Sequence, residues 1–467
     1  MSDLDVIILA AGQGTRMKSK TVKVLHRAAG RRIIEYVLDL ASDVGDRPPV
    51  VVVGHQRDDV QNAIGDRGRF AVQEEQKGTG HAVLMAAEIL ERETARGKRV
   101  LILSGDVPLT RPATLRQLVD QHEAERNALT LLTMKLDDPA MYGRVIRSAD
   151  GAVERIVEMK DASPEERSIS EVNAGVYVFD AEHLFDNLRG LSTNNAQGEY
   201  YLTDLIAILR GRGERVGAVI AADPTEALGV NSRADLAVVE GEIQRRVVQN
   251  LMSEGVTFRN PNTVVIDSTV SIGNDSVVYP FVTIEGTTKI GSGCVIEPGV
   301  HLINVTVGEN VHLKTGTVAE DAVIEDDAAV GPYAHLRPGT HLGRHVKVGN
   351  FVETKKARFG EGAKASHLSY IGDAEIGADV NIGAGTITCN YDGVNKNKTV
   401  LEDGVFIGSD TQLVAPVRVG RGAYVGAGST ITKDVPADAL ALSRVPQRVV
   451  EGWATKRRAD FAKKKKG

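Results

Sequence analysis

The sequence contains few cysteines and no long apolar run. Its two cysteines, Cys294 and Cys389, lie far apart and in no CxxC or Cys/His pattern. They indicate neither a disulfide framework nor a zinc site, and we expect two core thiols. No segment approaches the roughly 20 apolar residues of a membrane-spanning helix, and the short apolar run 6–11 follows acidic residues rather than the basic start of a signal peptide. These absences predict a soluble protein located in the cytoplasm.

Aromatic residues are also scarce, and the net charge is small. Only 4% of the 467 residues are aromatic, which suits interiors filled by small aliphatic side chains. The net charge of −6, from 56 basic and 62 acidic residues, gives no general reason to expect a nucleic-acid partner. The C-terminal end departs from this balance, because Lys456–Arg458 and Lys463–Lys466 form a basic tail. We expect this tail to be solvated and disordered.

The second half of the chain has an aliphatic residue at every sixth position, often followed by glycine. A helix would place apolar residues three and four apart and a flat strand two apart, so neither explains the spacing. A strict period of six is typical of the hexapeptide repeat of a parallel β-helix, in which stacked coils bury continuous columns of aliphatic side chains. Three such runs are Ile272, Val278, Ile284, Ile290 and Ile296; Ile324, Val330, Leu336, Leu342 and Val348; and Ile407, Leu413, Val419, Val425 and Ile431.

The first half alternates short aliphatic runs with longer amphipathic stretches. Buried strands are predicted at Val6–Leu9, Val50–Val53, Val100–Leu103 and Val176–Phe179. This alternation is typical of an α/β domain with a mostly parallel sheet. Because a chain of this length needs two or three domains, the change of pattern predicts one domain at residues 1–231 and a β-helix domain at 256–467.

A connecting helix is predicted between the domains, over residues 232–255. Ser232 is a suitable N-cap and Gly255 a suitable stop. The apolar residues that share one face of this helix are Leu236, Val239, Ile243, Val247 and Leu251.

The first predicted strand ends in a glycine-rich segment, Leu9–Met17, with the sequence LAAGQGTRM. A turn of this kind after a parallel strand brings backbone N–H groups close to phosphates, and the following helix N-terminus favours negative charge. The segment matches neither GxGxxG nor a Walker A sequence, which disfavours dinucleotide binding and P-loop hydrolysis. A tight turn without a ligand is the alternative.

Three further segments are predicted to converge on this turn. They are Lys23, the glycine segment Gln73–His81, and Asp106 at the end of another strand. Ligands of open α/β sheets bind at the carboxyl ends of strands, where these segments would meet. Asp106 is a candidate metal ligand, with an Asx turn before Pro108 as the alternative.

Together these segments resemble the sugar-1-phosphate nucleotidylyltransferase family. The resemblance rests on LAAGxGTRM, Lys23 in KVLH, GTGHA at 78–82 and GD at 105–106. With the hexapeptide repeats, the chain from about residue 5 to 450 is similar to the bacterial bifunctional family of N-acetylglucosamine-1-phosphate uridylyltransferases and glucosamine-1-phosphate N-acetyltransferases. That family implies a Rossmann-like α/β nucleotidylyltransferase domain, a left-handed parallel β-helix and a homotrimer.

The resemblance implies that the first domain transfers UMP from UTP to N-acetylglucosamine-1-phosphate and releases pyrophosphate. The sugar phosphate would attack the α-phosphorus in line, with charge neutralised by Lys23 and by Mg²⁺ held on Asp106 and Asn231. Gln13 and Val22 depart from the lysine and proline common in the family, which makes nucleotide preference less secure than nucleotide binding. The residues implied to bind nucleotide and sugar are Leu9, Ala10, Ala11, Gly12, Lys23, Gln73, Gly78, Thr79, Asp106, Gly143, Glu158, Asn173 and Asn231.

His367 lies off the aliphatic period of the β-helix. A histidine can take a proton from an ammonium near neutral pH, although a lone histidine is more often a surface or packing residue. The resemblance implies that His367 is the general base that prepares glucosamine-1-phosphate for acetylation by acetyl-coenzyme A. The sugar-phosphate ligands implied are Arg337, Lys355, Tyr370 and Asn381, and those of acetyl-coenzyme A are Ala384, Asn390, Tyr391, Ser409, Ala427 and Arg444.

The hexad pattern is interrupted at Cys389–Lys398, which reads CNYDGVNKNK. We expect a loop that projects from the β-helix, a common place for functional residues. In the family this acetyltransferase site is built from neighbouring subunits, so Lys396 could serve a shared site. The product would feed cell-envelope synthesis.

Two other interpretations stay open. One keeps only nucleotidylyl transfer and gives the β-helix a role in assembly or regulation, but His367 and the NYDG loop argue against it. The other is a non-catalytic scaffold, because the same domain pairing occurs in subunits of translation-initiation exchange factors. Arg16, Lys23 and Asp106 argue against that interpretation.

Overall fold

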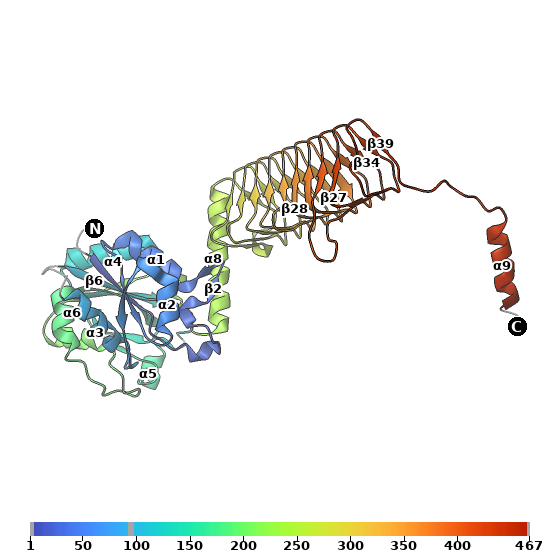
Figure 1. Cartoon of the computed structure of the whole chain (residues 1–467). Helices are drawn as coiled ribbons and strands as arrows, with labels where there is room; N and C mark the ends of the chain where they lie inside the picture. Colours follow the sequence, from blue (N-terminus) through green and yellow to red (C-terminus); the bar gives the residue numbers. More distant parts are fainter. Residues whose placement is uncertain (1–3, 92–97, 140, 465–467) are drawn as a thin grey trace. The chain divides into compact units, whose positions relative to one another are not determined.

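The computed structural model describes residues 4–91, 98–139 and 141–464 (Figure 1). The chain divides into two compact units, residues 1–248 and 249–467. Across the described ranges, no helix combines the length and the apolar character needed to cross a membrane.

The first unit is built on a mixed sheet with the strand order β11-β7-β10-β6-β1-β4-β5. Strand β10 is antiparallel to both of its neighbours, whereas the other strands of this order run parallel. All of the predicted strands are present, and the mostly parallel sheet is confirmed, with β10 and the antiparallel β8–β9 pair as the exceptions. The strands are β1 (Leu4–Leu9), β4 (Val50–Val53), β5 (Arg69–Val72), β6 (Arg99–Ser104), β7 (Leu129–Lys135), β10 (Glu171–Asp180) and β11 (Val216–Ile220), with β8 (Arg144–Arg147) and β9 (Val153–Val157) beside β10.

Helices cover both faces of this sheet, as Figure 1 shows. Along β1, Val6 and Ile8 face one apolar cluster and Ile7 faces the other, as the alternation of a strand requires. Burial on both faces explains why the strands are uniformly aliphatic. The first cluster includes residues of α1 (Ile33–Val44), α2 (Arg57–Ile64) and α4 (Pro112–Glu125), and the second includes residues of α3 (Thr79–Leu90), α6 (Ala181–Leu188) and α7 (Asp204–Gly211).

The predicted connecting helix is α8 (Arg233–Ser253). The Ser232 hydroxyl accepts a hydrogen bond from the Asp235 backbone N–H, and the Asp235 carboxylate accepts one from the Ser232 N–H, which caps the helix reciprocally. Val239 and Ile243 are buried in a third apolar cluster with Met17 of the first unit. The N-terminal part of α8 therefore packs as part of the first unit.

The second unit is a stack of parallel coils from β12 (Thr257–Phe258) to β39 (Leu440–Ala441). Equivalent residues of successive coils are in register, as in the column Ile266, Ile284, Leu302, Ala319 and Leu336. Every residue of the three predicted hexad runs is at most 5% exposed. The hexapeptide β-helix is confirmed.

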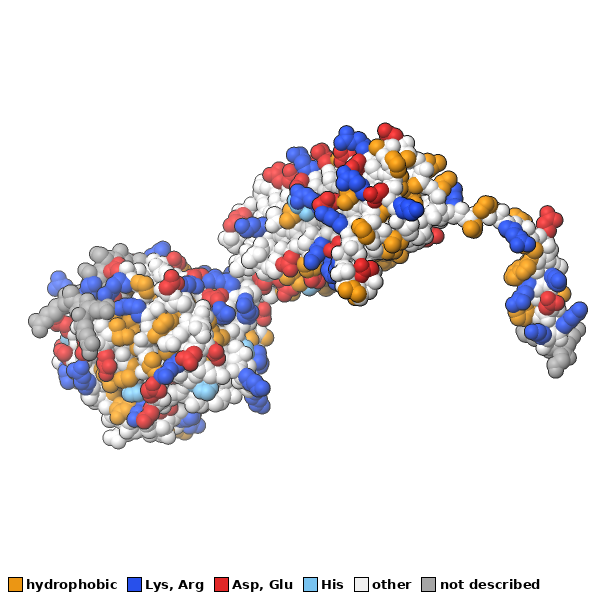
Figure 2. Space-filling view, in the orientation of Figure 1, with side chains coloured by type: hydrophobic (Ala, Val, Ile, Leu, Met, Phe, Trp, Pro, Cys, Tyr) orange, Lys and Arg blue, Asp and Glu red, His pale blue; other side chains and the backbone are white. Residues whose placement is uncertain are grey.

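Two expectations need correction, one about a cysteine and one about the C-terminal tail. Cys294 is buried, but Cys389 is only partly buried; it ends β32 (Ile387–Cys389), just before the hairpin closed by the Tyr391–Lys396 pair. The basic tail forms a helix, α9 (Trp453–Lys464), so disorder was the wrong prediction for these residues. Alanine, lysine and arginine are strong helix formers, and the helix is solvated along its length, with basic and apolar side chains exposed (Figure 2). Lys465 and Lys466 lie outside the described residues.

Candidate active sites

A pocket of about 340 Å³ opens at the carboxyl ends of β1 and β6. The glycine-rich segment forms one wall, and Gly14 is required there because a Cβ at its positive φ of 62° would lie 2.7 Å from Lys23 Cβ. The predicted residues that line the pocket are Leu9, Ala10, Ala11, Gly12, Lys23, Gln73, Gly78, Thr79 and Asp106. Residues that were not individually predicted as ligands also line it, namely Val24, Gln76, Ala82, Ser104 and Glu199.

Four polar side chains meet beside this pocket. The Lys23 ammonium forms an ion pair with Asp106 and donates to Asn231 Oδ1 at 3.1 Å. Arg16 Nη2 donates to the same Asn231 oxygen at 3.0 Å. Asp106 and Asn231, the two predicted metal ligands, are therefore close together although 125 positions separate them in the sequence.

These oxygens fit a magnesium ion. Within the described parts of the chain, no cluster of three or more histidine, cysteine or acidic residues could hold a metal ion. Mg²⁺ prefers oxygen ligands and is often held by one or two carboxylates together with substrate phosphates. One carboxylate and one amide oxygen suit that mode of binding.

Backbone contacts hold Asn231 near Asp106. The Val230 N–H donates to the Asp106 carbonyl at 2.9 Å. Behind them, the buried Thr110 hydroxyl donates to the Glu226 carbonyl at 2.9 Å, and the Arg111 N–H donates to the Glu226 carboxylate at 3.0 Å. The segment after β6 and the segment before α8 are thus fastened together.

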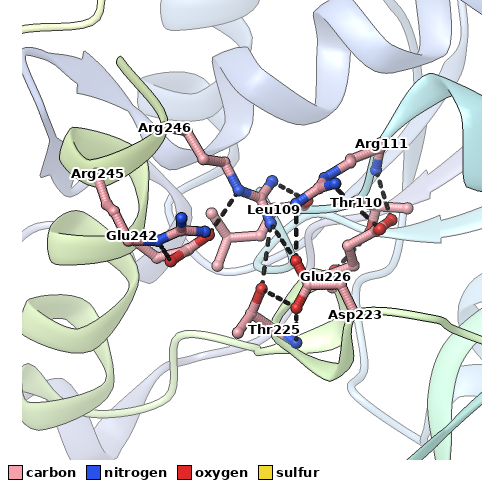
Figure 3. Close-up of polar contacts among 9 residues, drawn as sticks. All are labelled: Leu109, Thr110, Arg111, Asp223, Thr225, Glu226, Glu242, Arg245 and Arg246. Atoms are coloured by element: carbon pink, nitrogen blue, oxygen red, sulfur yellow. Dashed lines mark hydrogen bonds and ion pairs between the residues drawn. The ribbon is translucent and has the colours of Figure 1, made fainter. Parts of the chain in front are cut away.

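Arg246 of α8 strengthens the same junction (Figure 3). Its Nη1 donates to the Leu109 carbonyl at 2.6 Å, its Nη2 to Thr225 Oγ1 at 3.2 Å, and its Nε to Glu242 at 2.7 Å. Neighbouring Arg245 bonds to Glu242 but to neither of the two loops. Arg246 therefore ties α8 to the loops that carry the predicted metal ligands.

The predicted sugar ligands Gly143, Glu158 and Asn173 form a second group. The Asn173 N–H donates to the Gly143 carbonyl at 2.9 Å, and a Cβ at Gly143 would lie 3.3 Å from Glu158 Oε1. Burial raises the pKa of Glu158, and Asp161, among other nearby acids, raises it further.

A cavity links this second group to the glycine-rich segment. Its volume is about 450 Å³, and it is lined by Glu158 together with Thr15 and Arg16 of the glycine-rich segment. The predicted sugar side of the site therefore shares a wall with the predicted phosphate side.

In the second unit, His367 ends β29 (Lys364–His367) and is exposed. Its Nδ1 lies 2.7 Å from Asn350 Oδ1, at the end of the neighbouring strand β27 (Lys347–Asn350). An amide oxygen only accepts, so Nδ1 carries the proton and the lone pair stays on Nε2. Asn350 was missed because no motif in the sequence marks it.

Positive charge gathers around Lys355, on the sheet that carries Tyr370. Arg337 and Lys355 follow paired residues of β25 (His335–Leu336) and β28 (Glu353–Phe359) on successive coils. The Lys396 ammonium of the hairpin lies beside Lys355 and lowers the pKa of that lysine. Tyr370 pairs with Glu353 on the next coil. Arg337, Lys355 and Tyr370 thus lie on one sheet, whereas Asn381 lies in β31 (Asn381–Ile382) of the other.

The residues predicted for acetyl-coenzyme A fall into two groups. Ala384, Ser409 and Ala427 lie on successive coils, because their carbonyls accept bonds from Asp410 N–H at 2.7 Å, Gly428 N–H at 2.9 Å and Arg444 Nη1 at 2.6 Å. This row continues from His367, since the Gly385 N–H donates to the Leu368 carbonyl at 2.9 Å.

The other group stands at the base of the hairpin. Both Tyr370 and Asn390 crowd Gly372, where a Cβ would lie 2.5 Å from the Tyr370 hydroxyl and 2.8 Å from Asn390 Nδ2. Tyr391 pairs with Lys396 across the hairpin. Backbone N–H groups of Asn395 and Val394 bind the Asp392 carboxylate and lower its pKa to about 2, which fixes the tip of the hairpin.

Comparison with known proteins covers both units. Residues 5–224 match the Nucleotidyl transferase family, and residues 269–304, 321–356 and 398–433 match the Bacterial transferase hexapeptide family of six repeats. The Bifunctional protein GlmU of Trichlorobacter lovleyi is 51% identical, over 97% of this chain and 98% of its own length. The chain belongs to the GlmU family. The GlmU proteins of Syntrophotalea carbinolica and Koribacter versatilis are 53% and 48% identical, over 97% and 98% of this chain respectively.

Proposed function

We propose that the chain is a bifunctional transferase that makes UDP-N-acetylglucosamine. The β-helix acetylates glucosamine-1-phosphate with acetyl-coenzyme A, and the α/β domain then transfers UMP from UTP to the product with Mg²⁺ and releases pyrophosphate. The observation that supports this proposal is that a chain of the GlmU family brings Lys23 together with Asp106 and Asn231 in one unit and pairs His367 with Asn350 in the other.

In uridylyl transfer the chain positions phosphates and stabilises their charge. Lys23 and Arg16 supply positive charge where the triphosphate meets the glycine-rich segment, and Asp106 and Asn231 would hold Mg²⁺. When bound, the ion would neutralise the phosphate oxygens and the leaving pyrophosphate. No protein nucleophile is needed, because the sugar phosphate itself attacks the α-phosphorus.

In acetyl transfer His367 Nε2 takes one proton from the ammonium group of glucosamine-1-phosphate. The resulting amine attacks the thioester carbonyl and the N–C bond forms. The C–S bond then breaks as the nitrogen gives up a second proton to the leaving sulfur, which releases coenzyme A as the thiol. Arg337 and Lys355, with Lys396 beside them, suit the phosphate of the substrate. Asn350 keeps the lone pair of His367 on Nε2.

We also propose that three copies of the chain assemble through one corner of the β-helix. Within the described β-helix, nine of the fifteen non-glycine residues with positive φ are Asp or Asn, but this corner carries Phe281, Tyr333, Phe351 and Leu368, each at least 55% exposed. A large side chain in this conformation costs on the order of 1–2 kcal/mol. Tyr333 and Phe351 stack with ring centroids 5.8 Å apart. Coverage by another copy offsets this strain and places a neighbouring subunit beside His367.

The experiment is to assay the two half-reactions on one purified preparation. Glucosamine-1-phosphate with acetyl-coenzyme A should release free thiol. N-acetylglucosamine-1-phosphate with UTP should release pyrophosphate only when Mg²⁺ is present. Absence of thiol release would support a chain that only transfers nucleotides, and absence of both products would support a scaffold.

A further inference from the structure

The Gln73 side chain has a fixed orientation in the nucleotide pocket. It is 3% exposed, and its Nε2 donates to the Gly78 carbonyl at 3.1 Å and lies 3.0 Å from His81 Nδ1. A backbone carbonyl only accepts, so the amide nitrogen and not the amide oxygen must face this side. Both amide protons are then used within the protein.

The remaining atom of that amide is available to a ligand. No described residue donates a hydrogen bond to Gln73 Oε1, although Gln73 lines the pocket. The pocket therefore presents an acceptor, and no donor, from this side chain.

His81 completes the restraint. Since Gln73 Nε2 can only donate, His81 Nδ1 must accept, which requires a neutral imidazole with its proton on Nε2. Helix α3 holds the ring in its first turn, and the ring of Tyr200 lies alongside with centroids 6.3 Å apart. His81 also lines a separate pocket of about 280 Å³. His81 thus contacts Gln73 without lining the nucleotide pocket itself.

We propose that His81 is a positioning residue that sets nucleobase selectivity through Gln73. With Oε1 turned to the ligand, the pocket favours a pyrimidine that carries an N–H on its ring edge, as uracil and thymine do at N3. Cytosine has an acceptor at N3 and would face Oε1 with two lone pairs opposed. This inference rests on the proposed uridylyl transfer and names the atom that reads the base. It also attributes the nucleobase preference to Gln73 and His81 rather than to Gln13 and Val22.

The test compares His81→Phe with His81→Asn. Phenylalanine keeps a ring beside Tyr200 but accepts no hydrogen bond, whereas asparagine offers an acceptor oxygen. Initial rates with UTP and CTP give kcat/KM for each nucleotide. We expect His81→Phe to lower the UTP-over-CTP ratio about tenfold, mainly through the KM for UTP, because one neutral hydrogen bond is involved. His81→Asn should recover part of the ratio, and His183→Phe on α6, half-exposed and outside the nucleotide pocket, should leave it unchanged.

Each outcome decides the inference separately from the function. An unchanged ratio in folded His81→Phe, or equal losses with both nucleotides, would overturn the positioning role. If His81→Phe does not fold, competition by 3-methyl-UTP against UTP on the unaltered protein decides, since equal binding would exclude an acceptor that reads N3–H. Absence of uridylyl transfer in the unaltered protein would instead refute the proposed function.

Discussion

The proton on His367 is placed by a single neighbour. Asn350 accepts from Nδ1 at 2.7 Å, so Nε2 is the basic nitrogen. Replacing His367 with alanine should reduce acetyl transfer by about 10²–10⁴-fold, the usual contribution of a general base. Pyrophosphate release from UTP should not change, because His367 belongs to the other unit.

Coenzyme A release and pyrophosphate release measured on the same His367→Ala sample check this. His301→Ala is the matched control, since His301 is a partly exposed histidine of the same β-helix that pairs with Glu285. Wild-type acetyl transfer in His367→Ala would show that His367 is not the general base.

The partly buried carboxyl group of Glu158 links function to stability. Its pKa is raised above the ordinary 4.5, so the folded protein binds this proton more tightly than the unfolded chain does. The stability contributed by Glu158 therefore falls as pH rises from 4.5 through the raised pKa. Glu158→Gln should raise the melting temperature at pH 7 but not at pH 4, while weakening N-acetylglucosamine-1-phosphate binding.

Thermal melts at the two pH values, with a KM for the sugar phosphate, measure both effects. Glu154→Gln is the control, because Glu154 is exposed on the adjacent strand β9. A lower melting temperature for Glu158→Gln at pH 7 would show that the cost of burying the charged carboxylate does not dominate the effect of Glu158 on stability.

At the scale of elements, α8 holds together the loops that carry Asp106 and Asn231. Arg246 reaches the Leu109 carbonyl and Thr225 Oγ1, whereas Arg245 bonds to Glu242 alone among the residues of this cluster. Arg246→Ala should lower uridylyl transfer several-fold and raise the Mg²⁺ concentration required, because each lost hydrogen bond of a charged group costs roughly 1.5–3 kcal/mol. Arg245→Ala should stay near wild type in the same magnesium titration. Equal effects of the two substitutions would indicate that Arg246 does not hold the loops that carry Asp106 and Asn231, and that α8 contributes packing alone.

Elements with local signals could be predicted from the sequence. Each hexad specifies its own strand and turn, so the residues from Ile272 to Ile431 revealed the β-helix. The glycine-rich segment could be found for the same reason. Asn350 and Arg246 could not, because their roles depend on partners brought close only by folding, such as Leu109 at a separation of 137 residues. The reversed direction of β10 likewise has no signature within its own residues.

At the scale of the whole molecule, the corner of the β-helix that carries Phe281, Tyr333, Phe351 and Leu368 should matter for both assembly and acetylation. A substitution there should therefore reduce both together. Phe351→Asn should relieve backbone strain at its φ of 56° and remove apolar surface at the same time. Sedimentation should show dissociation of the proposed trimer, with loss of acetyl transfer and retained uridylyl transfer. Phe461→Asn in α9, which removes another exposed aromatic side chain, should remain trimeric. A trimeric Phe351→Asn protein would place the interface elsewhere.

Two centres in separate units should also complement each other in trans. Asp106→Ala should accumulate N-acetylglucosamine-1-phosphate, and His367→Ala should make no nucleotide sugar from glucosamine-1-phosphate. A mixture of the two purified variants should restore UDP-N-acetylglucosamine, because the released intermediate can reach an intact α/β domain. Chromatography of the nucleotide products measures this, and failure of the mixture would indicate that the intermediate is not released.

The most direct measurement is mass spectrometry of the products formed by the unaltered chain. The incubation contains glucosamine-1-phosphate, acetyl-coenzyme A, UTP and Mg²⁺. We expect UDP-N-acetylglucosamine, with free coenzyme A and pyrophosphate in equal amounts. Formation of no acetylated sugar would contradict the function assigned to the β-helix, and accumulation of N-acetylglucosamine-1-phosphate without a nucleotide sugar would contradict the function assigned to the α/β domain.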